Sequence, residues 1–446
     1  MSDDCARAWR IRPRVGVVAV ASPLEVGANR ASTLLQQAEV ALAGPEAPLE
    51  LVFAGVASTP DQAVAAGRLF HDRRVQVIVV LAASWFEDYL VGDMLEERPV
   101  PVILWGVPGM ETGSLCGCQQ AAQLLKATGR PVESLFGEVG PGPVADRARR
   151  YAAVAALQDQ LRRARIGILG QRVQGMTETT AHELALKRLF GPRLVGLDTQ
   201  LFLQAAERAD LEAARQEWAA VKGRVGRLAC SEADGLSSLQ VAAAMRQAVA
   251  EHKLNAVAVG CYPHLMGRVC LAASLLAEEG VPLACEGDVN GALGMLMLAW
   301  LSGAAVHNTD LLDPVPEVNA IVFSHCGSGG FSLAGRPEDI TLAPVRLMNQ
   351  GVCCLFPARP GEVTLVNIVP GLDGYTLAAM HGTAIETGMV FPGNPLKVAF
   401  ARPYEEALAW IAEQGLGHHW MATYGDWRYE LRTLAGLVGA RFTNWG

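Results

Sequence analysis

Residues 75–82, with the sequence VQVIVVLA, decide the fold class of this chain. The run is continuously apolar and rich in β-branched residues, which predicts a strand of a parallel sheet whose two faces are covered by helices. Apolar strands are also expected at 14–21, 51–56 and 100–105, and Pro60–Asp72 has the pattern of a helix between two of them. This alternation predicts an α/β unit at the start of the chain.

The alternation continues beyond a boundary that the sequence Gly-Pro-Gly-Pro at 140–143 marks. Strands are expected at 165–170, 194–198, 256–261 and 281–285, with long helical patterns near 202–221, 236–252 and 268–279. Strand, helix and strand at this spacing predict right-handed βαβ units and a second parallel sheet.

The sequence pattern changes after about residue 305, where short β-rich segments are separated by glycine and proline residues. Such segments are typical of a mostly antiparallel, barrel-like domain, and two helical patterns follow them at the end of the chain. The predicted architecture is therefore two doubly wound α/β domains, 1–145 and 146–304, and a β-rich domain, 305–446.

Composition excludes several classes of protein. The chain has 446 residues, of which 51% are apolar and 18% charged, and its formal net charge is −8. Such a chain can bury substantial cores, and without a basic run it does not favour a nucleic-acid partner. The longest apolar stretch, 291–301, is too short to span a bilayer, and the N-terminus lacks the pattern of a signal peptide. Ten scattered cysteines fit a reducing compartment. We therefore expect a soluble, cytoplasmic protein without a membrane partner.

The strongest functional pattern is ACEGDVNGAL at 284–293. An apolar strand is expected to end at Cys285, and the carboxylates of Glu286 and Asp288 follow it. Ligands of open α/β sheets bind at the carboxyl ends of the strands, and two neighbouring acids there need a cation, a shared proton or hydrogen bonds. Asp288 could instead only cap the next helix, but a cap does not account for Glu286.

Histidines that could act together with these carboxylates occur at three other places. His325 follows a predicted strand and precedes a Gly/Ser run, His264 lies at another strand end, and His418 and His419 are adjacent. Each could be structural when taken alone. Together with the two carboxylates they form a mixed nitrogen and oxygen set that suits a divalent first-row metal.

At these residues the chain resembles the L-fucose isomerase and L-arabinose isomerase superfamily, in its divergent fucose isomerase-like branch. The resemblance rests on ACEGDVNGAL, on Ser324-His325-Cys326 and on HHWMATYG at 418–425. It implies two α/β domains and a C-terminal β-rich domain, assembled as trimers or hexamers. It also implies an aldose–ketose isomerase that uses Mn²⁺ or another divalent first-row metal.

On the fucose isomerase pattern, Asp288 and His419 match metal ligands, and a third ligand, a glutamate, falls near His264. On the arabinose isomerase pattern, Glu286, His325 and His419 match ligands, and a further glutamate falls near Asn308 or Asp310. The chain departs from both patterns, because a histidine and an asparagine cannot act as carboxylates.

The resulting expectation is a metal-dependent isomerase that acts on a free or modified sugar through an enediolate, with acid/base groups beside the reacting carbons. The metal ligands expected are Asp288, His419, Glu286, His325 and His264, and the catalytic residues expected are Glu286, Asp288 and His264, with Asp310 as another possible base. Two alternatives stay open: an epimerase or an isomerase of a sulfonated or acidic sugar, and a sugar-binding protein without catalysis. The absence of a GxGxxG fingerprint disfavours a dinucleotide enzyme.

Overall fold

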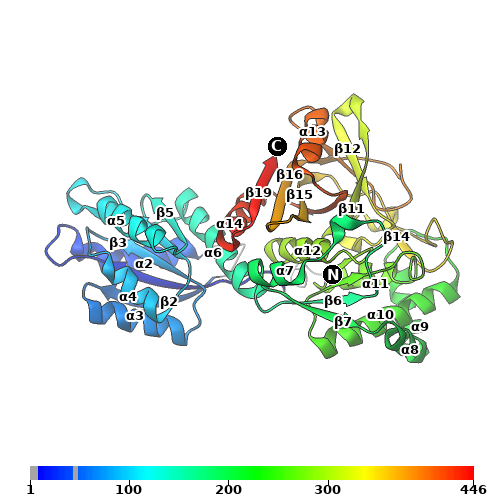
Figure 1. Ribbon diagram of the computed structural model, residues 1–446, viewed down its shortest axis with the longest axis horizontal. Coiled ribbons are helices and arrows are strands. Elements are labelled where there is room, and N and C mark those ends of the chain that lie inside the picture. Colours follow the sequence, from blue (N-terminus) through cyan, green and yellow to red (C-terminus); the bar gives the residue numbers. More distant parts are fainter. Residues whose placement is uncertain (1–8, 44–48) are drawn as a thin grey trace. The chain divides into compact units, whose positions relative to one another are not determined.

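The computed structural model describes residues 9–43 and 49–446 (Figure 1). Contacts divide the chain into two compact units. One unit is Ile11–Gln160, and the other comprises Leu161–Gly446 with Trp9 and Arg10. Each unit is described below by itself.

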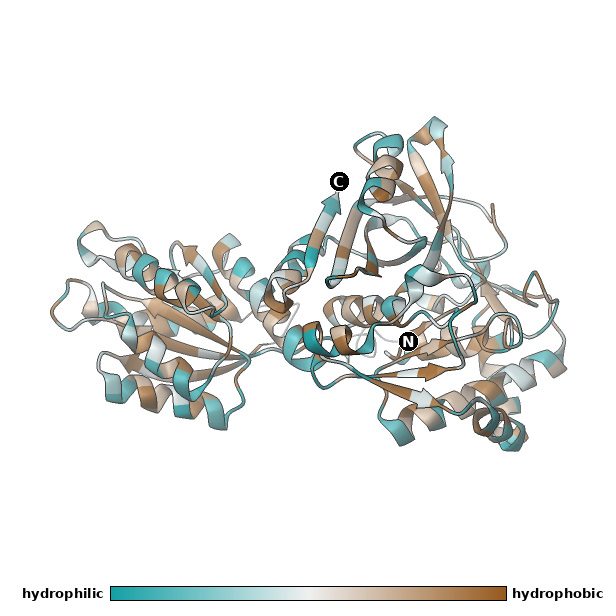
Figure 2. Ribbon diagram, viewed as in Figure 1, coloured by the Kyte–Doolittle hydropathy of each residue, from teal (hydrophilic) through white to brown (hydrophobic). Residues whose placement is uncertain are grey.

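The unit Ile11–Gln160 contains a parallel sheet of five strands in the order β2-β1-β3-β4-β5. This order is typical of doubly wound sheets, in which helices connect parallel neighbours. The buried strands are coloured brown in Figure 2, as expected for the apolar run around residue 80. The strands are β1 (Arg14–Val20), β2 (Glu50–Ala57), β3 (Val77–Ala82), β4 (Val102–Gly106) and β5 (Val132–Phe136). The helices are α2 (Ala31–Leu42), α3 (Pro60–Asp72), α4 (Tyr89–Glu97), α5 (Ser114–Ala127) and α6 (Pro143–Leu161), the last of which reaches the unit boundary.

A second parallel sheet has the order β10-β9-β6-β7. Its strands are β6 (Arg165–Leu169), β7 (Arg193–Leu197), β9 (Ala256–Val259) and β10 (Leu283–Ala284). Its helices are α7 (Glu183–Leu189), α8 (Thr199–Arg208), α9 (Leu211–Lys222), α10 (Glu232–His252) and α11 (Cys270–Glu278). The prediction of a single helix over 202–221 is wrong, because two helices occupy this range. The side chain of Asp210 accepts hydrogen bonds from the N–H groups of Glu212 and Ala213, and so it starts a new helix.

Seven of the later strands form one sheet, which belongs to the β-rich domain expected from the sequence. Their order is β15-β18-β11-β12-β17-β16-β19, and an additional pairing of β15 with β16 closes six of them into a barrel. The strands are β11 (His307–Val315), β12 (Ala320–Ser324), β15 (Gly361–Pro370), β16 (Tyr375–Ile385), β17 (Leu396–Ala399), β18 (His419–Tyr424) and β19 (Arg441–Trp445). Helices α13 (Tyr404–Gln414) and α14 (Arg428–Val438) accompany them. The fold class predicted from the sequence is thus confirmed.

Shorter elements complete the fold. A small sheet joins β8 (Arg227–Leu228), β13 (Thr341–Ala343) and β14 (Cys353–Leu355). Short 3-10 helices are η1 (Ala28–Arg30), η2 (Met110–Thr112), η3 (Thr177–Thr179), η4 (Pro316–Val318), η5 (Phe331–Leu333) and η6 (Pro337–Asp339).

Helix α12 (Val289–Ser302) links the second sheet to the barrel. It packs against β6, β9 and β10 and also against β11, β15 and β18. All its residues from Val289 to Leu301 are buried, which explains why its sequence is apolar on every side. Among the helices of the described ranges, none is long and apolar enough to cross a membrane. The first turn of α12 follows the Glu-Gly-Asp sequence directly, so its packing fixes the position of those carboxylates.

Candidate active site

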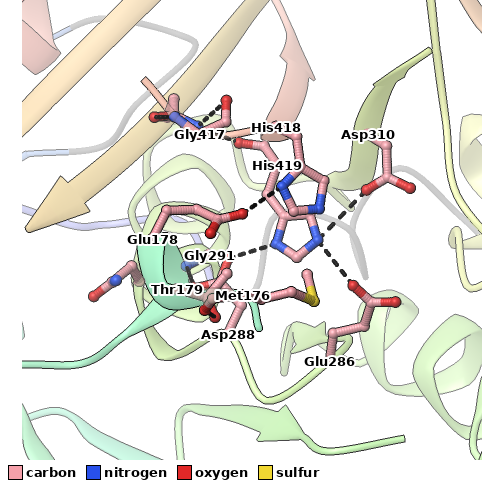
Figure 3. A network of polar contacts seen from close by, with 12 residues as sticks. Met176, Glu178, Thr179, Glu286, Asp288, Gly291, Asp310, Gly417, His418 and His419 are labelled. Carbon is pink, nitrogen blue, oxygen red and sulfur yellow. Dashed lines mark hydrogen bonds and ion pairs between the residues drawn. The ribbon is translucent and has the colours of Figure 1, made fainter. Parts of the chain in front are cut away.

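The turn between β10 and α12 has an unusual backbone. Glu286 has a φ of 63° and Gly287 a φ of 72°. Holding a non-glycine residue in this left-handed region costs about 1 kcal/mol or more, and such strain is common at functional sites. The Glu286 carboxylate that this turn carries is directed toward the ring of His419 (Figure 3).

Glycine is required where the loops of the second sheet meet. A Cβ atom at Gly287 would lie 2.6 Å from the backbone nitrogen of Arg172, which follows β6. A Cβ atom at Gly260, just after β9, would lie 2.2 Å from the carbonyl oxygen of Gln171. The carboxyl ends of β6, β9 and β10 therefore converge with their backbones in contact. This is the edge of an open α/β sheet at which ligands bind.

Asp288 has two structural contacts. Its Oδ1 accepts a 2.8 Å hydrogen bond from the N–H of Gly291, which makes it the N-cap of α12 as the sequence indicated. Its Oδ2 lies 2.9 Å from Nδ1 of His419. The residue is only 4% exposed. Both oxygens are thus engaged, one by the helix and one by the imidazole, and the contact holds the ring of His419 in one orientation.

His419 lies at the centre of the site and comes from the first residue of β18 (Figure 3). Its Nε2 lies 3.2 Å from Oε2 of Glu286 and 3.4 Å from Oδ1 of Asp310. Burial lowers the pKa of His419, but hydrogen bonds to Asp288 and Glu286 and the charge of Asp310 outweigh it and raise the pKa to about 10. Burial raises the pKa of Glu286, but the contact with His419 and the charges of the neighbouring histidines lower it below its usual value. The side chains therefore stabilise one another's charged forms.

Asp310 and His325 complete one side of the site. Asp310 is on β11, directly opposite His419 in the antiparallel register of β11 and β18. His325 follows β12, and its Nε2 lies 3.7 Å from Oδ1 of Asp310. Both of these atoms are buried without a hydrogen-bond partner. Unpartnered buried polar atoms are costly, so a ligand that satisfies them is expected here.

His418 and Glu178 form another side. Nδ1 of His418 lies 2.7 Å from Oε1 of Glu178, a residue of η3 in the loop after β6. The His418 and His419 rings are stacked obliquely, with centroids 4.2 Å apart. The sequence named the histidine pair but gave no role to Glu178. Its place after β6, at the carboxyl end of a parallel strand, is the signal that could have identified it.

The structure brings together most of the residues expected from the sequence, namely Glu286, Asp288, His325 and His419. His264 is exposed in the turn after β9 and belongs to neither of the groups that could hold a cation. Asn308 is buried on β11, and its amide has no hydrogen-bond partner.

The donor set is suited to a divalent ion. Ligand atoms of Glu286, His418 and His419 lie within 4.8 Å of one another, and so do those of Asp310, His325 and His419. Oδ1 of Asp310, which is buried without a hydrogen bond, is the kind of atom that a cation would satisfy. Carboxylates combined with imidazoles suit Mn²⁺, Fe²⁺, Co²⁺ or Zn²⁺. The residues present therefore fit the divalent metal that the sequence predicts.

Comparisons with known proteins point to one activity. No family model matches the chain. It is 27% identical over 371 residues to a sulfoquinovose isomerase of Alkalicoccus urumqiensis, in a match covering 81% of this chain and 84% of the relative. It is 26% identical over 384 residues to a sulfoquinovose isomerase of Priestia megaterium (82% and 84% covered) and 24% identical over 356 residues to one of Clostridium sp. strain MSTE9 (76% and 79% covered). These matches support the predicted enzyme class, a sugar isomerase.

Proposed function

We propose that this chain is a metal-dependent aldose–ketose isomerase whose substrate is a sulfonated sugar such as sulfoquinovose. The observation that carries the proposal is the convergence of Glu286 and Asp310 on Nε2 of His419. The names of the relatives, which cover most of this chain, support the substrate class.

An aldose and its ketose differ in the positions of two hydrogens, one bound to carbon and one bound to oxygen, so the chain must move one proton between neighbouring carbons and one between their oxygens. A base takes the proton from the carbon beside the carbonyl, which leaves an enediolate, and returns it to the adjacent carbon. Glu286 and Asp310 are the acid/base pair in this proposal, because both carboxylates lie beside Nε2 of His419. A divalent ion, when bound, would supply Lewis-acid stabilisation of the negative charge that develops on the sugar oxygens.

Other residues of the site position these groups. In this proposal Glu286, Asp310 and His419 hold the ion. Asp288 keeps Nδ1 of His419 as a hydrogen-bond donor and so keeps its Nε2 directed at the two carboxylates. His264, which is exposed, has no role in the proposed chemistry.

The proposal is tested by incubating the purified protein with sulfoquinovose and Mn²⁺ and following the sugar by NMR. We expect the corresponding ketose to accumulate until equilibrium is reached. EDTA should abolish the conversion, and added Mn²⁺ should restore it. A product that is an epimeric aldose, or conversion that survives complete removal of divalent ions, would contradict the proposal.

Ion binding to the metal-free protein should also release a proton. The pKa of His419 is raised to about 10, so the ring carries two protons at pH 7.5 and must lose one before Nε2 can bind an ion. We expect about one proton to be released per Mn²⁺ at pH 7.5. The number should fall toward zero as the pH rises through the pKa of His419. Calorimetry in two buffers of different ionisation enthalpy measures this number, and its absence at pH 7.5 would exclude His419 as a ligand.

A further inference from the structure

Three histidines surround the same point, and the hydrogen bond at Nδ1 of each decides what its Nε2 can do. A neutral imidazole has one N–H donor and one nitrogen with a lone pair. Only the nitrogen with the lone pair can bind a cation. The partner of Nδ1 therefore determines whether the other nitrogen is a ligand or a donor.

His418 resembles His419 in this respect. Its Nδ1 faces Oε1 of Glu178 at 2.7 Å, as Nδ1 of His419 faces Oδ2 of Asp288 at 2.9 Å. A carboxylate accepts only from an N–H group, so both rings carry a proton on Nδ1. The lone pair that binds an ion is then on Nε2, which in His419 is freed when the second proton is lost on ion binding. Carboxylates that orient metal-binding histidines in this way are common in metalloenzymes.

His325 has the opposite arrangement. Its Nδ1 accepts a 2.9 Å hydrogen bond from the backbone N–H of Cys326. In the neutral ring the proton must then be on Nε2, which is buried and has no hydrogen-bond partner. This N–H can donate to Asp310, whose Oδ1 lies 3.7 Å away, or to a sugar oxygen, but it cannot bind a cation.

The position of His418 also favours it over His325 as a ligand of the ion. One of its ring nitrogens lies within 4.8 Å of ligand atoms from Glu286 and His419. Since Glu178 engages Nδ1, the nitrogen with the free lone pair is Nε2. The side chain of His418 is 41% exposed, so an ion can reach it from solvent, whereas that of His325 is 2% exposed.

We propose that His418, held by Glu178, is the second imidazole ligand of the ion beside His419, and that His325 is a hydrogen-bond donor in the site. This inference rests on the proposed function, because it assigns ligands to the same ion. It makes Glu178, in the loop after β6, a positioning residue of the metal site.

Pulsed EPR of the Mn²⁺-loaded protein tests the assignment by counting coordinated histidine nitrogens. We expect two in the wild type, one in His418→Asn and two in His325→Asn. Because His325 is buried, His325→Gln provides a second variant in case the asparagine variant does not fold. Two nitrogens in His418→Asn together with one in the His325 variants would overturn the proposal.

Mn²⁺ affinity, measured by calorimetry, tests the role of Glu178 separately. Glu178→Gln should weaken binding by about 10-fold to 100-fold, as is usual when the partner of a metal-binding histidine is lost. The matched control is Glu183→Gln on α7, where the exposed side chain belongs to neither group of possible ligands. Equal affinities for Glu178→Gln and Glu183→Gln would overturn the positioning role. A wild-type protein that binds no divalent ion would instead overturn the proposed function itself.

Discussion

His419→Asn should lower kcat/KM for the sulfonated sugar by about 10³-fold or more, because it removes the group on which both carboxylates converge. Nε2 of His419 contacts Glu286 and Asp310, and its Nδ1 contacts Asp288. The variant should also bind Mn²⁺ far more weakly. Steady-state kinetics at saturating Mn²⁺ and calorimetric titration with Mn²⁺ measure the two effects.

A matched control is His381→Asn. His381 lies on β16 of the same barrel, and its Nε2 contacts Glu362, outside the site. This variant should keep kcat/KM and Mn²⁺ affinity close to those of the wild type. If His419→Asn retained more than a tenth of the wild-type activity, the residue would not be a ligand and the proposed site would be wrong.

The sequence predicted the elements whose pattern is local. The helix Pro60–Asp72 has the expected bounds, because it has a continuous helical pattern between clear ends. The strand β18 was not expected, because its residues 419–424 were interpreted only as part of a site. Closure of the barrel by the pairing of β15 with β16 also depends on contacts that no local pattern reveals.

In the site, too, the sequence predicted the residues that a local pattern identifies and missed the contacts that depend on tertiary packing. Glu286 and Asp288 are identified by a local rule, since they follow a strand and precede a helix. The position of Asp310 opposite His419 depends on the register of two strands more than 100 residues apart in the chain. From the sequence, Asp310 was therefore named only as another possible base and as one of two positions near a ligand of the arabinose isomerase pattern. Glu178 is brought to His418 by tertiary packing, and the pair has no sequence spacing that identifies it.

Glu286→Gln should lower kcat by about 10²-fold to 10⁴-fold, the range that a positioned acid/base group contributes. The substitution keeps the size of the side chain and an oxygen that can face His419, but it removes the ability to accept a proton from carbon. The left-handed backbone at position 286 tolerates glutamine as well as glutamate, so the turn should keep its conformation. Binding of the sugar should therefore change less than turnover.

Exchange of the sugar's carbon-bound hydrogen with solvent separates catalysis from binding in this variant. In D₂O, the wild type should incorporate deuterium at the carbon beside the carbonyl, whereas Glu286→Gln should incorporate it more slowly by the same factor as its kcat. Asp310→Asn is the informative comparison, because the two carboxylates lie at similar distances from His419, 3.2 Å and 3.4 Å. If Asp310→Asn alone abolished exchange and Glu286→Gln exchanged at the wild-type rate, Asp310 would be the base and Glu286 only a ligand. Loss of exchange in both variants, with Mn²⁺ still bound, would support an acid/base pair in which each carboxylate serves one direction of the proton transfer.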